Sequence, residues 1–192
     1  MSEKIEIMGI SVEKCYAEDI MESINQHWNE DTLATYGVIT MKLLIAAQKD
    51  EELKEYIETL DKAVADEPEI VKAAGLQDEA WESEISEHGF FGTLFWLLNL
   101  YKNRIFILGE KEEDTEKFCN YLREQYPDVV ILGKDSLTDM EADQTDRVIN
   151  EINSWNPQAV LSCSREYNVE RFVKRYRKMM NTKVWFSLGS SL

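Results

Sequence analysis

The sequence predicts an α/β protein with a Rossmann-like, doubly wound, mostly parallel sheet that has helices on both faces. In the second half of the chain, short apolar runs alternate with segments of helical periodicity, which is typical of βαβ units. These apolar runs are unbroken rather than alternating, as expected for parallel strands that are covered on both faces. A length of 192 residues favours a single domain over residues 1–192.

Residues 102–192 form the more regular half of this expected domain. Strands are expected at residues 104–109, 128–133, 159–161 and 183–188. Apolar residues at helical spacing predict helices over residues 112–126, 140–155 and 168–180. Pro127 and Pro157 end the first two of these helices, because proline cannot continue a helical hydrogen-bond ladder.

Residues 1–101 form a helix-rich half with a less regular pattern. Strands are expected at residues 4–10 and 33–39. Helices are expected at residues 17–28, 41–47, 51–60, 67–74 and 90–101, together with an acidic amphipathic segment at residues 81–86. No linker or internal repeat is visible, so we expect both halves to share one compact body.

The charge balance excludes two classes of partner. The chain has 37 Asp and Glu residues against 21 Lys and Arg residues, a formal net charge of −16. Nucleic acids and anionic membrane surfaces both attract clustered cations, so this charge argues against binding to either. The one basic cluster comprises Arg171, Lys174, Arg175, Arg177 and Lys178. Charges along a helix usually face water, so we interpret this cluster as a solvated helix face.

The cysteines and the apolar segments give expectations about compartment and cofactors. The three cysteines lie far apart and form no CxxC pair, so we expect neither a disulfide nor a metal site, and no cofactor. The first ten residues lack the apolar region of a signal peptide. The most apolar stretch, residues 90–100, is shorter than the roughly 20 residues that span a bilayer. We therefore expect a cytoplasmic protein without a membrane span.

In open parallel sheets, ligands bind beyond the carboxyl ends of the strands, so the turns at these ends are the candidate anion sites. Gly109 is followed by several carboxylates, which repel a diphosphate and favour a purely structural turn. The turn at residues 133–136 has one glycine and one cation and is a weak candidate. The turn at residues 162–168 has no glycine, although Arg165 and hydroxyl groups could hold an anion, and Gly189 and Ser190 belong to a fair anion loop.

Two side chains are candidates for catalysis. Cys163 follows an expected strand and precedes a helix, where a thiol can become acidic, but neither His27 nor His88 has a spacing that ties it to this cysteine. We therefore favour an inert, buried cysteine. Asp66 follows an apolar triplet and precedes Glu-Pro, a pattern that is typical of a helix cap.

The order of segments from residue 5 onward resembles the WecG/TagA/CpsF family of bacterial glycosyltransferases, glycosyltransferase family 26. The clearest motifs are Arg104-Ile-Phe-Ile-Leu-Gly109, Val129-Val-Ile-Leu-Gly133, Pro157-Gln-Ala-Val-Leu161 and Val184-Trp-Phe-Ser-Leu-Gly189. The resemblance implies transfer of an N-acetylmannosamine-type sugar from a UDP-sugar to an undecaprenyl-diphosphate-linked acceptor, without a divalent metal. It also implies that Asp66 is the catalytic base, because it falls where members of the family carry an Asp-Gly pair.

The same resemblance implies a substrate site made by Thr40, Gly109, Arg165, Glu170, Gly189 and Ser190. If it holds, Asp66 should share a cleft with residues 163–166 and 187–190. The chain departs from the family at several of its motifs. The glycine-rich family motif Gly-x-Gly-x-Pro-x-Gln-Glu corresponds here to residues 163–170 and keeps only Glu170. The Asp of the family's Gly-Thr-Asp-Leu motif is absent from residues 92–95.

Two hypotheses therefore stand. In the first, the chain is a family member with a degenerate nucleotide-sugar site that acts as a non-catalytic or accessory module in cell-surface polysaccharide synthesis. In the second, it is an active glycosyltransferase with a divergent site around Asp66. The expected ligand is a UDP-sugar or another nucleotide, and a homo-oligomer or a partner protein is compatible with either hypothesis.

Overall fold

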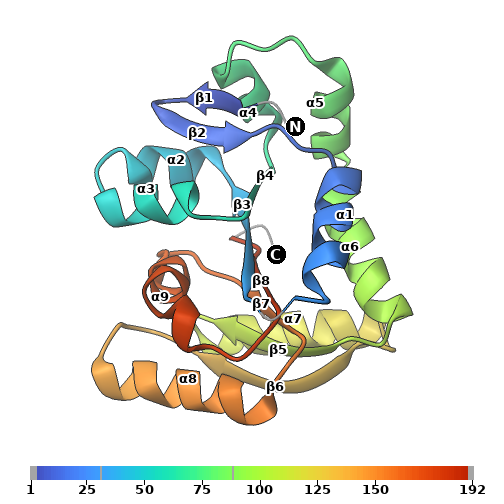
Figure 1. Cartoon of the computed structure of the whole chain (residues 1–192), viewed down its shortest axis with the longest axis vertical. Helices are drawn as coiled ribbons and strands as arrows, with labels where there is room; N and C mark the ends of the chain where they lie inside the picture. Colours follow the sequence, from blue (N-terminus) through green and yellow to red (C-terminus); the bar gives the residue numbers. More distant parts are fainter. Residues whose placement is uncertain (1–3, 31, 88, 190–192) are drawn as a thin grey trace.

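Six parallel strands form the central sheet of the computed structural model, which describes residues 4–30, 32–87 and 89–189 (Figure 1). The strand order is β4-β3-β8-β7-β5-β6. The strands are β3 (Ala34–Ile39), β4 (Lys62–Ala65), β5 (Arg104–Gly109), β6 (Val130–Ser136), β7 (Ala159–Ser162) and β8 (Val184–Ser187). The predicted α/β class and the parallel arrangement of the last four strands are confirmed.

Helices cover both faces of the sheet, as predicted (Figure 1). One face carries α1 (Ala17–His27), α6 (Gly89–Leu100) and α7 (Glu112–Gln125). The other carries α2 (Met41–Ala47), α3 (Glu51–Glu58), α8 (Ala142–Trp155) and α9 (Asn168–Tyr176), and a 3-10 turn (Arg177–Met179) follows α9. The helices α4 (Pro68–Ala73) and α5 (Glu79–Ser86) lie beyond the carboxyl end of β4. Among the described residues, no helix has both the length and the apolar character that crossing a membrane requires.

The N-terminal segment is a hairpin rather than the single strand expected at residues 4–10. Strands β1 (Lys4–Ile7) and β2 (Ile10–Glu13) pair in antiparallel register. Met8 and Gly9 connect them with φ angles of 54° and 75°. Two successive residues with left-handed backbone conformation make a tight hairpin turn that matches the twist of the strands. The apolar run continues across this turn, which is why periodicity alone did not show it.

Two strands at the edges of the sheet also differ from the expectation. Strand β4 was not predicted, because it contains one lysine and two alanines and only Val64 favours a strand, yet it pairs with β3 along its length. Strand β6 continues through residues 133–136, which were expected to form a turn. These polar residues are tolerated on an edge strand, where Lys134 pairs with Glu116 and Asp135 with Arg147.

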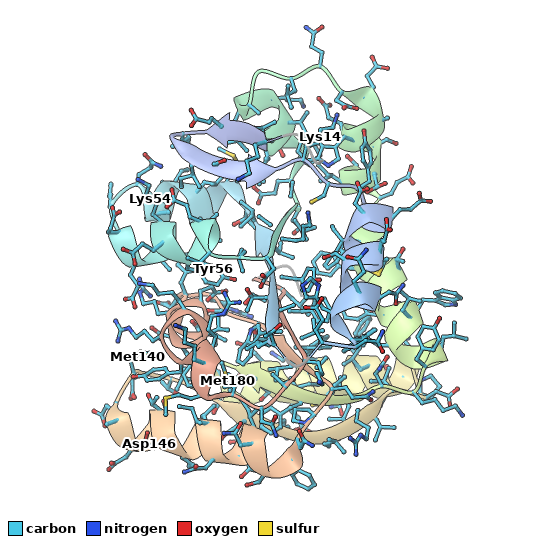
Figure 2. All side chains as sticks on the ribbon, viewed as in Figure 1. Lys14, Lys54, Tyr56, Met140, Asp146 and Met180 are labelled. Carbon is cyan, nitrogen blue, oxygen red and sulfur yellow. The ribbon has the colours of Figure 1, made fainter. Side chains whose placement is uncertain are left out.

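The two halves of the chain meet in the sheet and between α3 and α9. Strand β3 pairs with β8 at the centre of the sheet, and the buried ring of Tyr56 lies between α3 and α9 (Figure 2). The basic cluster stays at the surface, with Arg175 and Lys178 exposed, but it is not surrounded by water alone. Three of its cations pair with the acidic face of α3: Arg171 with Asp50 at 2.6 Å, Arg175 with Glu52 at 2.5 Å, and Lys174 with Glu55. These neighbours hold the pKa of the Asp50 and Glu52 carboxyls below their usual range, chiefly through hydrogen bonds from Arg171 and Arg175.

Candidate functional site

The topology of the sheet locates the site between β5 and β7. From β5 the chain crosses through α7 to β6 on one side, and from β7 it crosses through α9 to β8 on the other side. Helices α7 and α9 pack on opposite faces of the sheet. Adjacent strands whose connections depart in opposite directions leave a crevice at their carboxyl ends, which is where α/β proteins bind ligands.

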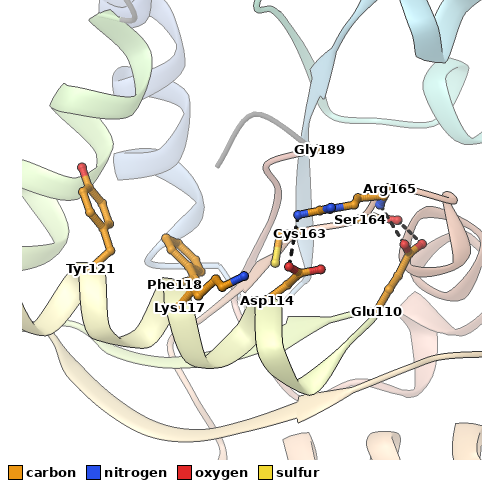
Figure 3. Close-up of a pocket in the computed structure, with 9 residues that line it drawn as sticks. All are labelled: Glu110, Asp114, Lys117, Phe118, Tyr121, Cys163, Ser164, Arg165 and Gly189. Carbon is orange, nitrogen blue, oxygen red and sulfur yellow. Dashed lines mark hydrogen bonds and ion pairs between the residues drawn. The ribbon is translucent and has the colours of Figure 1, made fainter.

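A cavity of about 400 Å³ opens at this point (Figure 3), and we call it the switch-point cavity. Its lining comes from the ends of three strands and from one face of α7: Glu110, Asp114, Lys117, Phe118, Tyr121, Cys163, Ser164, Arg165 and Gly189. The volume lies within the range of roughly 300–1,000 Å³ that is usual for small-molecule sites.

The carboxylate of Glu110 occupies the anion position at the start of α9. It is 6% exposed and accepts hydrogen bonds from the Ser164 hydroxyl at 2.5 Å and from the Arg165 N–H at 2.8 Å. It also accepts from the N–H groups of Glu166 and Asn168, each at 2.9 Å. Free N–H groups at a helix N-terminus bind phosphate in many α/β proteins. Here an internal carboxylate already uses them.

The two cations at the cavity are also engaged. Arg165 pairs with Asp114 across the mouth, at 3.1 Å between Nη2 and Oδ1 (Figure 3). Lys117 pairs with Glu113 one turn earlier on α7, at 2.5 Å. Each positive side chain that lines the cavity therefore faces a carboxylate of the same chain.

Tyr167, which lies directly before α9, has a strained backbone and a partly buried side chain. Its φ is 64°, which costs about 1–2 kcal/mol for a residue with a bulky side chain. Its ring lies beneath the Lys42 ammonium, at 5.8 Å. Burial, with the carboxylates of Glu170, Glu67 and Glu110 adding to it, raises the pKa of Tyr167 to about 12.

Glu170 is held inside the protein rather than at a substrate surface. It is 2% exposed, and its Oε2 atom has no hydrogen-bond partner among the described residues. Burial raises the pKa of Glu170 to about 7, and the nearby Glu110 carboxylate adds to the shift. The Ser164 hydroxyl and Arg171 act in the opposite direction.

Asp66 lies at the carboxyl end of β4, in a recess separate from the switch-point cavity. It lines a space of about 20 Å³ together with Cys15, Trp81 and Phe90, among others. The expectation that Asp66 caps α4 is wrong, because Glu67 occupies the cap position and accepts instead from the Met41 N–H at 2.7 Å. Strands β4 and β8 are two strand spacings apart, about 10 Å, so one substrate could still reach from Asp66 to the end of β8.

The other predicted substrate residues have identifiable structural roles. Thr40 caps α2, since its hydroxyl accepts from the Leu43 N–H at 3.1 Å. Gly109 permits the close approach of α7, because a Cβ atom there would lie 2.7 Å from the Thr115 methyl. Gly189 lines the cavity and has a φ of 63°, a conformation that favours glycine. Ser190 lies outside the described residues.

Cys163 lines the cavity but is not activated. Burial raises the pKa of the Cys163 thiol to about 12, and the carboxylates of Asp114, Glu170 and Glu110 add to the shift. The helix N-terminus that could lower this pKa is already neutralised by Glu110. This raised pKa supports the inert cysteine that we favoured, but Cys163 is partly exposed on the cavity wall and not buried as expected.

We expect Cys163 to resist alkylation. At pH 8 its thiolate fraction should be about a thousandfold lower than that of an ordinary cysteine, because each pKa unit changes this fraction tenfold. The rate of iodoacetamide labelling at Cys163, followed by mass spectrometry, should be at least roughly a hundredfold slower in the folded protein than in urea. A folded-state rate close to the unfolded-state rate would contradict this assignment.

Several lining residues were not singled out from the sequence. Asp114, Lys117, Phe118 and Tyr121 face the cavity from α7. Their spacing of three, four and seven residues is that of one helix face, which was the signal available. Glu110 is one of the acids that follow Gly109, and its bonds to the start of α9 join segments more than 50 positions apart, which no local pattern indicates. Among the described residues, no group of three or more His, Cys, Asp or Glu side chains is placed to hold a metal ion.

Comparison with known proteins agrees with the resemblance found in the motifs. A model of the glycosyl transferase WecG/TagA/CpsF family matches residues 5–192. The chain is also similar to an N-acetylglucosaminyldiphosphoundecaprenol N-acetyl-beta-D-mannosaminyltransferase of Bacillus subtilis (strain 168), with 22% identity over 172 residues. This match covers 89% of the chain and 66% of the relative, so the chain spans just under two thirds of that protein.

Proposed function

Because the chain belongs to the WecG/TagA/CpsF family of glycosyl transferases, we propose that it is a non-catalytic, accessory member with a degenerate nucleotide-sugar site. The setting that we propose is cell-surface polysaccharide synthesis, on the basis of the relative's name. A module of this kind would act through a partner protein or as a homo-oligomer.

The position of the Glu110 carboxylate is the observation that carries this proposal. A UDP-sugar brings a diphosphate that needs hydrogen-bond donors and positive charge. The N–H groups at the start of α9 already bind Glu110, and Arg165 is paired with Asp114. A diphosphate in this place would have to displace a buried carboxylate and break an ion pair.

The position of Asp66 supports the second candidate, an active transferase that moves an N-acetylmannosamine-type sugar from a UDP-sugar to a lipid-linked acceptor. Asp66 directly follows β4, a parallel strand two strand spacings from β8, which leaves it within reach of a substrate bound across the sheet edge. In that case Asp66 would remove a proton from the acceptor hydroxyl as a general base.

Calorimetry and a transfer assay separate the two candidates. We expect no measurable heat from UDP or from UDP-N-acetylmannosamine titrated into the protein, and no transfer to an N-acetylglucosaminyl-diphospho-lipid acceptor. Transfer by the native chain that is abolished in Asp66→Ala would overturn the accessory role and establish the transferase. The matched control is Asp61→Ala, because this carboxylate lies at the opposite end of β4 and pairs with Arg177 at 3.0 Å.

A further inference from the structure

We propose that the switch-point cavity binds an uncharged, largely apolar ligand. This inference rests on the proposed function: if the cavity does not bind a nucleotide sugar, the question is which class of ligand it binds instead. It follows from the state of the charged groups at the cavity and from the nature of its walls.

Among the described residues, each charged group at the cavity already has a partner in the same chain, which disfavours an anionic ligand. Glu110 is saturated by the start of α9, and Asp114 neutralises Arg165 at the mouth. Lys117 is paired with Glu113. An anion would also meet the Glu110 and Asp114 carboxylates and the net charge of −16. A cation would find its candidate partners, the same two carboxylates, already bound.

The walls suit an apolar ligand. Phe118 is 4% exposed and is held by Phe95, with a distance of 6.0 Å between the ring centroids. Tyr121 contacts the same Phe95, with 6.2 Å between the ring centroids, is 42% exposed and lines the cavity from α7 (Figure 3). The sulfur atom of Cys163 completes a surface of aromatic and soft apolar groups. Two rings anchored on a third form a preorganised wall, which reduces the entropy lost on binding.

A matched pair of fluorescent probes tests the proposal. N-phenyl-1-naphthylamine is uncharged, and 8-anilino-1-naphthalenesulfonate is the same fluorophore with a sulfonate. We expect saturable fluorescence enhancement with the uncharged probe, and binding of the sulfonate that is weaker by about tenfold or more, because its charge would be buried without a free partner. Equal affinity for the two probes, or no saturable binding of the uncharged one, would overturn the proposal.

Two cavity variants locate the probe, one core variant is their control, and a fourth variant tests the charge argument. Cys163→Leu fills part of the cavity and should weaken binding of the uncharged probe by about tenfold. Cys119→Ala changes a cysteine of α7 that lies in the core and should leave this binding unchanged. Tyr121→Ala, at a position that is 42% exposed, should also weaken the uncharged probe, and it keeps the proposal testable if Cys163→Leu does not fold. Asp114→Asn frees Arg165 and should strengthen the sulfonate several-fold without changing the uncharged probe. Unchanged binding in both Cys163→Leu and Tyr121→Ala would place the probe elsewhere and refute the assignment.

These outcomes can be distinguished from those that decide the proposed function. Tight binding of UDP by calorimetry would overturn the accessory role whatever the naphthylamine does. Failure of both UDP and the naphthylamine would leave that role standing and would remove only the apolar ligand.

Discussion

Glu110→Ala should lower the free energy of unfolding by about 3 kcal/mol, measured by urea denaturation at pH 7. The substitution removes a buried carboxylate and leaves three backbone N–H groups and the Ser164 hydroxyl without their acceptor. The vacated position should then accept an external anion. Added sulfate should therefore stabilise the variant more than the native chain, since a ligand that binds only the folded state raises its stability by mass action.

Glu112→Ala is the matched control for this experiment. Glu112 lies two residues further along, in the first turn of α7, and its side chain is exposed. Its removal should cost only about 0.5 kcal/mol, the usual contribution of an acidic residue to a helix N-terminus. A loss for Glu110→Ala no larger than this would show that the carboxylate is not a structural part of the α9 N-terminus.

Glu170→Gln should remove a pH-dependent loss of stability of about 3 kcal/mol. Burial raises the pKa of Glu170 from an ordinary value of 4.5 to about 7 in the folded protein. The folded state therefore binds the proton more tightly than the unfolded state. Stability is fully present below about pH 4.5 and falls as the pH rises to about 7, and each pKa unit corresponds to about 1.4 kcal/mol.

The measurement is the difference in unfolding free energy between Glu170→Gln and the native chain, compared at pH 4 and pH 8. This difference should move in favour of the variant by about 3 kcal/mol, because glutamine has no charge to bury. Glu166→Gln, at an exposed position four residues earlier, should show no such change. A difference that does not depend on pH would mean that Glu170 titrates normally in the folded protein.

Local patterns were sufficient for most of the elements. Unbroken apolar runs marked β5, β7 and β8, because these strands are buried on both faces. Helical spacing marked α7, α8 and α9, because a helix that buries one face repeats its apolar residues with the helical period. The family could likewise be identified from short motifs that stand in order along the chain. Where the pattern was weak or continuous, as at β4 and at the turn between Met8 and Gly9, it did not define the element.

The sequence by itself therefore determined the fold class, the family and a set of candidate residues at the strand ends. Only the tertiary structure decided which of those residues meet. Glu110 and Ser164 are separated by 54 positions, and Arg175 and Glu52 by 123, so no local period links them. Whether a carboxylate repels a phosphate or takes its place depends on the hydrogen-bond donors that the fold brings to it. Strand order and helix packing determine those donors, because they bring together segments that are distant in the sequence.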